Sequence, residues 1–389
     1  MSTPRDGFWP DERHRTLLHA ALDRGDAGVR AWQRWRDMVD FDYADGPELR
    51  LLPLAYANLG DAIRDDAVFG RAGGLFRRTW TQNQLLFDRA AGALSALANA
   101  GIEPMLLKGA ALSVLHYRSA GARPMADVDV LVPPFGAERA MAVLRAEGWR
   151  GEAEPAERQI RIHHSYPFRD GGVGHIDLHW FSLWQSSSDR PLWGAARPLE
   201  LAGAAALAPS PSDLLLVVCA HGTPRQPEPA FRWIADAVTV IRTAEVDWDR
   251  FAAEARRRNL AVAAAAALRY VREELGAEVP EDVPARLAPE RAPRWERAAY
   301  RAQSSPAGPA RTTRLLLERN RRMRMLRDEA PWHPGFLTYA ASIWGFERPW
   351  ELPAHAARRV FAGAAARVRP GRTRARTVPP ARGNRDPAS

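Results

Sequence analysis

The chain has 389 residues, of which 46% are hydrophobic and 26% charged, a composition typical of a soluble globular protein with two or three domains. Its formal net charge is +9, but residues 358–389 hold nine arginines and one aspartate, so the rest is close to neutral. The charge therefore does not indicate a uniformly basic nucleic-acid-binding surface, and the single cysteine, Cys219, excludes an intramolecular disulfide or a cysteine-based zinc site within one chain.

Targeting and membrane segments are not expected. The N-terminal stretch "MSTPRDGFWPDERH" is charged and has no apolar core, so it does not resemble a secretory signal peptide. The longest apolar run, "LAVAAAAAL" at Leu260–Leu268, is too short to cross a bilayer. We therefore expect a cytoplasmic protein without a membrane span.

The first hundred residues are predicted to be helical. The segments "HRTLLHAAL" and "LFRRTWTQNQLLFDRAAGALSALANAG" carry apolar residues at the three- and four-residue spacing of an amphipathic helix. Gly101 is a plausible stop for the second of them.

The pattern then changes to alternating strands and helices. Strands are predicted at "PMLL", "ADVDVLV", "QIRIHHSYPFR" and "GHIDLHWF", with a turn "RDGG" between the last two, and helices at "GAALSVLHY" and "FGAERAMAVLRAEGW". This order predicts an α+β fold in which a small mixed sheet carries helices on one face.

From residue 206 onward the chain is predicted to be helical again. The first helix, "PSDLLLVVCAHG", could be capped by Ser212 or Asp213. After about Gly363 the sequence has almost nothing to bury, and we predict a disordered tail. The expected parts are a helical N-terminal region (1–100), an α/β core (101–205), a helical C-terminal domain (206–362) and an Arg- and Pro-rich tail (363–389).

Two aspartates interrupt the strand "DVDVLV". Alternation along a strand puts Asp127 and Asp129 on the same face. Two ionised carboxylates about 5 Å apart repel by roughly 3 kcal/mol at an effective dielectric constant near 20, and a divalent cation reverses that cost. Mg²⁺ binds one or two carboxylates together with waters and substrate phosphates. The alternative is a solvent-facing strand edge, or a turn that carries two caps.

A third acid, Asp177, lies in the later strand "HIDLHW" between Ile176 and Leu178. Three carboxylates on two neighbouring strands can hold two metal ions, one that activates a hydroxyl nucleophile and one that binds the triphosphate. The third acid can also accept the proton of the nucleophile.

These segments, in this order, resemble an uncharacterised bacterial family of the DNA polymerase β-like nucleotidyltransferase superfamily. The resemblance spans roughly residues 85–259 and includes "LLLVVCAHG", "RWIADAVTVI" and "VDWDRF". It implies a polymerase β-like core flanked by helical regions, with Gly109 as the turn glycine, Asp127 and Asp129 as the metal pair and Asp177 as the third acid. Ala110 follows the glycine where much of the superfamily has serine.

The resemblance also implies an activity. The expected reaction moves a nucleoside monophosphate from an NTP to a hydroxyl of a small molecule, protein or RNA end and releases pyrophosphate, with Mg²⁺ or Mn²⁺ as cofactor. Three alternatives stay open. These are a silent nucleotide-binding module on the same fold, a protein that contacts nucleic acid weakly through its arginine-rich tail, and a zinc hydrolase built on His175 and His179.

Lys108 and Arg123 are the predicted phosphate ligands, together with Gly109. Lys108 is the only lysine among 55 basic residues, and it precedes a helix whose free N–H groups favour anions. Arg123 could bind a phosphate with two nitrogens or pair with an acid of the site.

Several histidines lie close to these acids. His175, Asp177 and His179 share one strand face and could form a zinc site, although the neighbouring aspartates favour Mg²⁺. Otherwise His179 is expected to donate a supporting hydrogen bond. At most one of the adjacent His163 and His164 can reach the site.

The family resemblance also marks His221 and Asp236 in the helical half. The residues themselves give neither of them a catalytic role.

Overall fold

The computed structural model describes residues 9–151, 160, 161, 163–184, 187–223, 231–305, 309–326, 328, 329, 331, 332, 335–343, 346, 348, 350 and 351. The chain divides into two compact units, residues 1–339 and 340–389. The sheet and the helices described below belong to the first unit, except for the last helix, Phe336–Ile343, which crosses its boundary. The predicted tail after Gly363 lies outside the described residues.

The N-terminal region is helical, as predicted. Aspartate side chains cap two of its helices: Asp11 accepts from the His14 N–H, and Asp45 forms a capping box with Glu48. The long helix α4 packs against α3 near its start and against the sheet further along, and it ends just before Gly101, whose φ of +71° explains the predicted stop. The helices are α1 (Glu12–Leu22), α2 (Gly25–Met38), α3 (Gly46–Leu59) and α4 (Phe69–Asn99).

The described strands form one seven-stranded mixed sheet in the order β3-β4-β5-β2-β1-β7-β6. Strand β2 is parallel to β5, and β1 is parallel to β7, whereas the other neighbours are antiparallel. The strands are β1 (Met105–Leu106), β2 (Val128–Leu131), β3 (Arg150–Gly151), β4 (Ser165–Arg169), β5 (His175–His179), β6 (Arg197–Leu201) and β7 (Ala204–Ala208).

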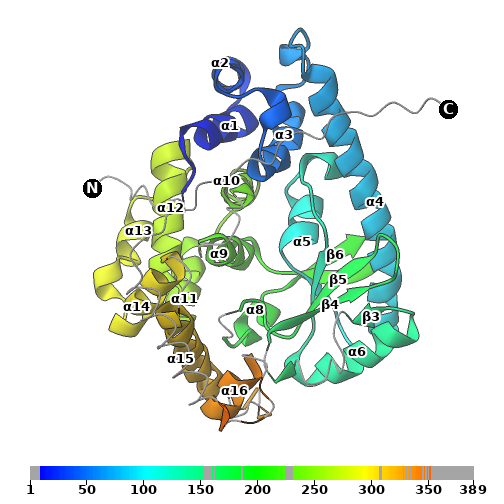
Figure 1. Ribbon diagram of the computed structural model, residues 1–389, viewed down its shortest axis with the longest axis vertical. Helices are drawn as coiled ribbons and strands as arrows, with labels where there is room; N and C mark the ends of the chain where they lie inside the picture. The colour runs from blue at the N-terminus through cyan, green and yellow to red at the C-terminus, as the bar shows by residue number, and fades with distance from the viewer. Residues whose placement is uncertain are drawn as a thin grey trace, which may run out of the picture. The chain divides into compact units, whose positions relative to one another are not determined.

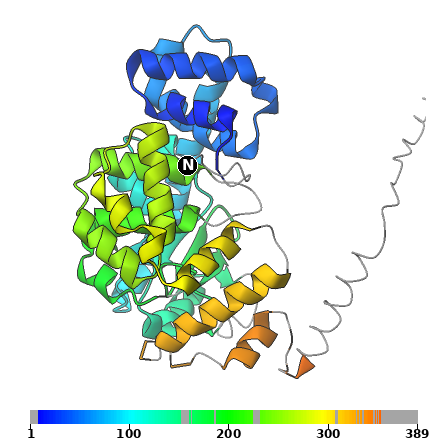
Figure 2. The same ribbon diagram turned by 90° about the vertical axis from the view of Figure 1, so that its left-hand side faces the viewer.

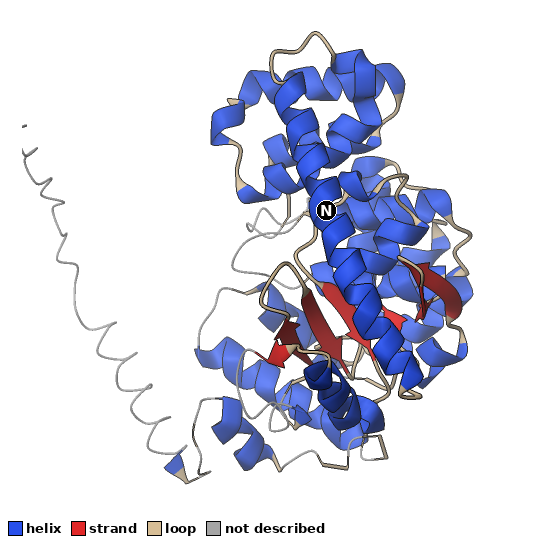
Figure 3. Cartoon of the chain, turned by 90° about the vertical axis from the view of Figure 1, so that its right-hand side faces the viewer, coloured by secondary structure: helices blue, strands red, loops and turns tan. Residues whose placement is uncertain are grey.

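Helix α4 runs across one face of this sheet (Figure 3), and α6 (Ala137–Ala146) packs against α4. Helix α5 (Lys108–Leu115) follows β1 and packs against β2. The predicted α+β class, with a mixed sheet between helical regions, is confirmed.

The sheet differs from the prediction at two places. The hairpin β6–β7 was not expected, because β7 is rich in alanine, which has low strand propensity; its two-residue turn uses Ala202 and Gly203, both with positive φ. Strand β4 is also shorter than predicted. The His164 carbonyl accepts from the backbone N–H groups of Trp180 and Phe181, so the chain there wraps around the end of β5 instead of extending β4.

Helix α9 contacts α10, α11 and α12 and also touches α5 (Figure 1). Figure 2 shows the C-terminal helices, coloured green to yellow, from another side. The cap of α9 was predicted wrongly: Ser210, not Ser212 or Asp213, accepts from a backbone N–H, that of Asp213. The described helices after β5 are α8 (Arg190–Gly194), α9 (Pro211–Gly222), α10 (Arg232–Thr243), α11 (Trp248–Arg257), α12 (Ala261–Leu275), α13 (Asp282–Arg286), α14 (Arg294–Ser304), α15 (Pro309–Met325) and α16 (Phe336–Ile343).

Short 3₁₀ helices connect several of these elements. They are η1 (Phe41–Tyr43), η2 (Gly60–Ile63), η3 (Ala120–Ala122), η4 (Pro134–Gly136) and η5 (Pro289–Arg291). Within the described part of the chain, no helix combines the length and the apolar character that a membrane crossing requires. The result is a sheet whose β2 strand lies close to α5, with α9 beside that helix.

Candidate active site

Asp129 and Asp177 lie side by side on neighbouring parallel strands. Strands β2 and β5 pair with Asp129 opposite Asp177 and Val128 opposite Ile176. Because side chains alternate along a strand, both carboxylates leave one face of the sheet, and the fully buried valine and isoleucine point to the other. The structure thus brings two of the three predicted carboxylates together.

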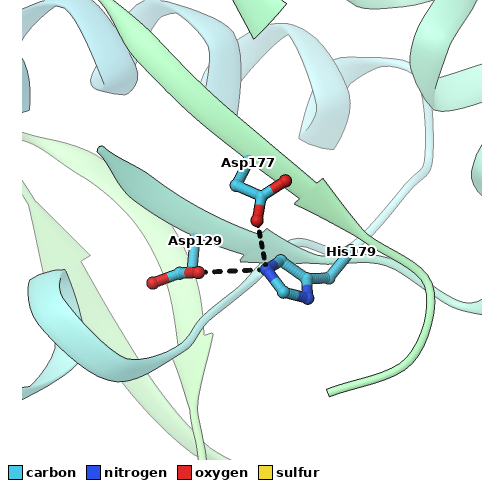
Figure 4. A group of neighbouring side chains, drawn as sticks. All are labelled: Asp129, Asp177 and His179. Atoms are coloured by element: carbon cyan, nitrogen blue, oxygen red, sulfur yellow. Dashed lines mark hydrogen bonds and ion pairs between the residues drawn. The ribbon is translucent and has the colours of Figure 1, made fainter. Parts of the chain in front are cut away.

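His179 completes a compact group with these acids (Figure 4). Its Nε2 lies 3.0 Å from Asp129 Oδ1 and 3.0 Å from Asp177 Oδ2. Its Nδ1 lies 3.2 Å from the Phe181 carbonyl oxygen, and because a carbonyl only accepts, Nδ1 carries a proton. Among the described residues, no other group of three or more His, Cys, Asp or Glu side chains has its possible metal-ligand atoms within 4.8 Å of one another.

The protonation of His179 follows from its surroundings. Burial and the charge of Lys108 lower the pKa of this imidazole, but the charge of Asp177 and the hydrogen bonds to Asp129 and Asp177 outweigh them and raise the pKa to about 9. At neutral pH its Nε2–H therefore donates to both carboxylates. With a cation between the acids, the deprotonated Nε2 would itself be a ligand. The imidazole favours a transition metal such as Zn²⁺, whereas the two carboxylates favour Mg²⁺ or Mn²⁺.

Lys108 contacts the same carboxylate. Its Nζ lies 2.7 Å from Asp129 Oδ1, the oxygen that also faces His179. Burial would raise the pKa of Asp129, but Lys108 and His179 outweigh it and hold the pKa far below its usual range. Asp129 is therefore ionised between two cationic groups. Lys108 was predicted to bind phosphate, and in the structure its ammonium forms an ion pair with Asp129.

Asp127 has a different environment. It precedes β2 by one residue and is half-buried, outside the group formed by Asp129, Asp177 and His179. Burial and the nearby charge of Asp129 raise its pKa above the usual range. Of the predicted metal ligands, it is the one best suited to receive a proton.

Arg123 pairs with an acid, but not with one of the carboxylate cluster. Its Nε and Nη2 donate to Asp236 on α10, each over 2.8 Å, and Tyr117 Oη donates to the same carboxylate over 2.7 Å. The third nitrogen, Nη1, is buried and has no partner among the described residues. Asp236 therefore fixes the arginine while leaving one donor available, a role that the sequence did not reveal.

A cavity of about 460 Å³ joins these groups. Asp127, Asp129 and Asp177 line it on the sheet side, and Gly109 lines it at the start of α5. The cationic side chains of its wall are Lys108, Arg123, Arg50 and Arg232. Arg50 and Arg232 were not predicted, because in a chain with 54 arginines their positions in the sequence carry no signal. The cavity places anion donors beside a carboxylate pair.

The remaining histidines lie at different depths. The His164 ring packs edge-on against His179 with centroids 5.2 Å apart, whereas His163 is exposed, so one of the two reaches the cluster. His221 lines the cavity. His175 does not join the three-residue group, so the zinc site that was left open as an alternative lacks one of its ligands.

Gly109 has a steric role that can be tested. A Cβ at this position would lie 2.9 Å from Arg123 Nη1, and the pairing with Asp236 holds that arginine in place. We expect Gly109→Ala to lower the free energy of unfolding by about 1–3 kcal/mol through overpacking. Urea unfolding followed by tryptophan fluorescence measures the loss.

Gly92, within α4, gives the matched control. A Cβ there meets nothing within 4 Å, so Gly92→Ala should raise the free energy of unfolding by about 0.5–1 kcal/mol. Equal stabilities of the two variants would contradict the tight contact between Gly109 and Arg123.

Comparison with known proteins gives one family match. Residues 48–276 match a family model described as "Uncharacterised nucleotidyltransferase". Among curated proteins none matches the chain.

Solved structures that are similar include the following two. The antibiotic-resistance factor ANT(2'')-Ia shares 15% identity over 41% of this chain and 84% of its own, with a TM-score of 0.30. An antigenic nucleotidyltransferase-like protein from Paracoccidioides brasiliensis shares 15% identity over 51% of this chain and 94% of its own, with a TM-score of 0.36.

Proposed function

We propose, because the chain belongs to the family of uncharacterised nucleotidyltransferases, that it transfers a nucleoside monophosphate from an NTP to a hydroxyl of an acceptor. In this reaction the acceptor oxygen bonds to the α-phosphorus, and the bond from that phosphorus to the α,β-bridging oxygen breaks. Pyrophosphate leaves with the electron pair, and the acceptor's proton passes to a carboxylate.

One observation carries the proposal: an in-register carboxylate pair lines a cavity that four cationic side chains also line. Phosphoryl transfer needs little from a protein beyond positioning and charge neutralisation. Lys108, Arg123 Nη1 and the free N–H groups at the start of α5 are donors for the phosphates. Arg50 and Arg232 extend this donor set along the cavity wall.

The carboxylate group fits a divalent cation. Asp129 Oδ1, Asp177 Oδ2 and His179 Nε2 converge, and the two carboxylates are the ligands that Mg²⁺ or Mn²⁺ prefers. When bound, such a cation would neutralise charge on the transferred group and lower the pKa of the attacking hydroxyl. Asp177 and Asp127 line the same cavity, so either carboxylate can take the hydroxyl proton.

Labelled nucleotides test the proposal directly. The protein is incubated with each α-labelled NTP in turn, with Mg²⁺ or Mn²⁺, and with protein, RNA and small-molecule fractions of a cell extract as acceptors. We expect label in one fraction, dependent on the metal and abolished by a chelator. If no fraction gains label and pyrophosphate release stays at the rate without protein for all four nucleotides, the protein is not a nucleotidyltransferase.

A further inference from the structure

Lys108 occupies the carboxylate oxygen of Asp129 at which a metal ion would bind. Asp129 Oδ1 has two acceptor positions, and both are occupied: His179 Nε2 lies 3.0 Å away and Lys108 Nζ 2.7 Å away. The aspartate is only 6% exposed, so it needs a positive partner to remain ionised. The ammonium supplies that charge.

The backbone directs the lysine to this place. The Leu107 N–H donates to the Asp129 carbonyl oxygen over 3.0 Å, which holds the residue before Lys108 against β2. Lys108 itself has a φ of +38°, a left-handed conformation that costs a residue other than glycine roughly 1–2 kcal/mol. The fold accepts this strain in the residue whose side chain reaches Asp129.

A divalent cation and the lysine cannot share this oxygen. Two unit charges 4 Å apart interact by about 4 kcal/mol at an effective dielectric constant of 20, so a divalent cation would repel the ammonium by about twice that amount. A cation bound to Asp129 therefore has to displace Lys108. The nearest places for a displaced ammonium lie along the cavity, which Lys108 already lines beside Gly109 and the start of α5.

We propose that Lys108 is the resident counter-ion of Asp129, that a divalent cation displaces it, and that the displaced ammonium binds the phosphates of the nucleotide. The inference rests on the proposed function, because it assumes that a metal and an NTP use this cavity. It also explains why one lysine stands among 54 arginines. Lysine is a compact point charge on a flexible four-carbon stem and can move between two anions, whereas the wide, planar guanidinium is less able to fit beside His179 on one oxygen.

The lone lysine makes the displacement visible in the wild-type protein. With lysine labelled at ¹³Cε and ¹⁵Nζ, the side chain of Lys108 gives a single set of signals. We expect these signals to shift when Mg²⁺ is added and to shift again when a non-hydrolysable NTP analogue follows. Asp129→Asn should lack the first shift. If calorimetry detects Mg²⁺ binding while the Lys108 signals do not move, the inference is wrong.

Metal affinity gives a second, independent readout. Without nucleotide, Lys108→Met should bind Mn²⁺ at least about tenfold more tightly than the wild type, because no competing ammonium remains. Arg50→Met is the matched control, since Arg50 lines the same cavity but no hydrogen bond or ion pair to the acids is found for it in the described part of the chain. Its Mn²⁺ affinity should change less than about threefold through general electrostatics.

The outcomes separate this inference from the proposed function. Equal Mn²⁺ affinities of Lys108→Met and Arg50→Met overturn the inference alone and leave a metal-dependent transferase in place. If neither the wild type nor Lys108→Met binds Mn²⁺, and circular dichroism shows both to be folded, the metal-dependent function and the inference both fail. Tighter binding by Lys108→Met with unchanged transfer of label would keep the counter-ion role and remove the phosphate role.

Discussion

Replacing Asp129 by alanine should reduce the rate of nucleotidyl transfer by at least about 10³-fold. Lys108 and His179 both contact this carboxylate, which is the most deeply buried of the three acids. Single charged groups that neutralise the transferred phosphoryl group are worth about 10³- to 10⁵-fold in related phosphoryl-transfer chemistry. Transfer of label from an α-labelled NTP at saturating Mg²⁺ measures the loss.

An exposed aspartate provides the control for this variant. Among the described residues, Asp61 forms an ion pair only with Arg64 at the surface, and its side chain is 77% exposed. Asp61→Ala should therefore transfer label at the wild-type rate. If Asp129→Ala does as well, the carboxylate pair is not the catalytic centre, whatever the fold. Asp127→Ala should lose less activity than Asp129→Ala, because Asp127 lies outside the group that includes His179.

The sequence predicts local features of this site well. Alternation of acids and apolar residues is a property of each strand by itself. Asp129 and Asp177 could therefore each be assigned to a strand, and to one face of that strand, before the pairing of the strands was known. What alternation does not contain is the register between strands. The pairing of β2 with β5 places these acids directly opposite each other, and it also brings His179 within 3.0 Å of Asp129, 50 residues earlier.

Contacts between distant segments account for what was missed. Arg123 and Asp236 are 113 residues apart in the sequence. Each fits its own segment, Arg123 before the strand with the aspartates and Asp236 within a helix, so neither sequence indicates that the two form a pair. A helix aspartate with apolar neighbours is ordinary in sequence, and its role appears only when α10 packs beside the loop that carries Arg123. The β6–β7 hairpin was not predicted for a different reason. Alanine has a weak strand propensity, but alternate residues of β7 are buried in the structure, and this burial outweighs the propensity.

Replacing Asp236 by alanine should lower the free energy of unfolding by about 3–5 kcal/mol. Arg123 and Asp236 are each only about 4% exposed, and the guanidinium would lose both of its charged contacts while remaining buried. Tyr117 would lose its acceptor as well. Urea unfolding followed by tryptophan fluorescence checks the prediction, with Asp61→Ala as the variant whose midpoint should not move.

The pH dependence of this loss has a defined sign. Burial alone would raise the pKa of Asp236, but Arg123 outweighs burial and holds it below the usual range. The folded-state pKa therefore lies below the unfolded value of about 3.9, so the ion pair stabilises fully above that pH and its contribution is lost as pH falls through the folded-state pKa. The gap in stability between the wild type and Asp236→Ala should accordingly be constant from pH 7 to about 5 and narrow below pH 4. A gap that stays constant to pH 3 would show that the carboxylate charge does not stabilise the fold.

A double variant separates the stabilising role of this pair from its role in the site. Arg123→Met with Asp236→Leu replaces both charges by apolar groups, and exchanges of this kind are often neutral or stabilising, so most of the stability lost in Asp236→Ala should return. Activity of the double variant should stay below that of the wild type, because the buried Nη1 donor beside Gly109 is gone. Weaker binding of a non-hydrolysable NTP analogue, at wild-type stability, is the result that identifies Arg123 as a phosphate ligand positioned by Asp236. Wild-type nucleotide affinity in the stable double variant would reduce the pair to a structural role.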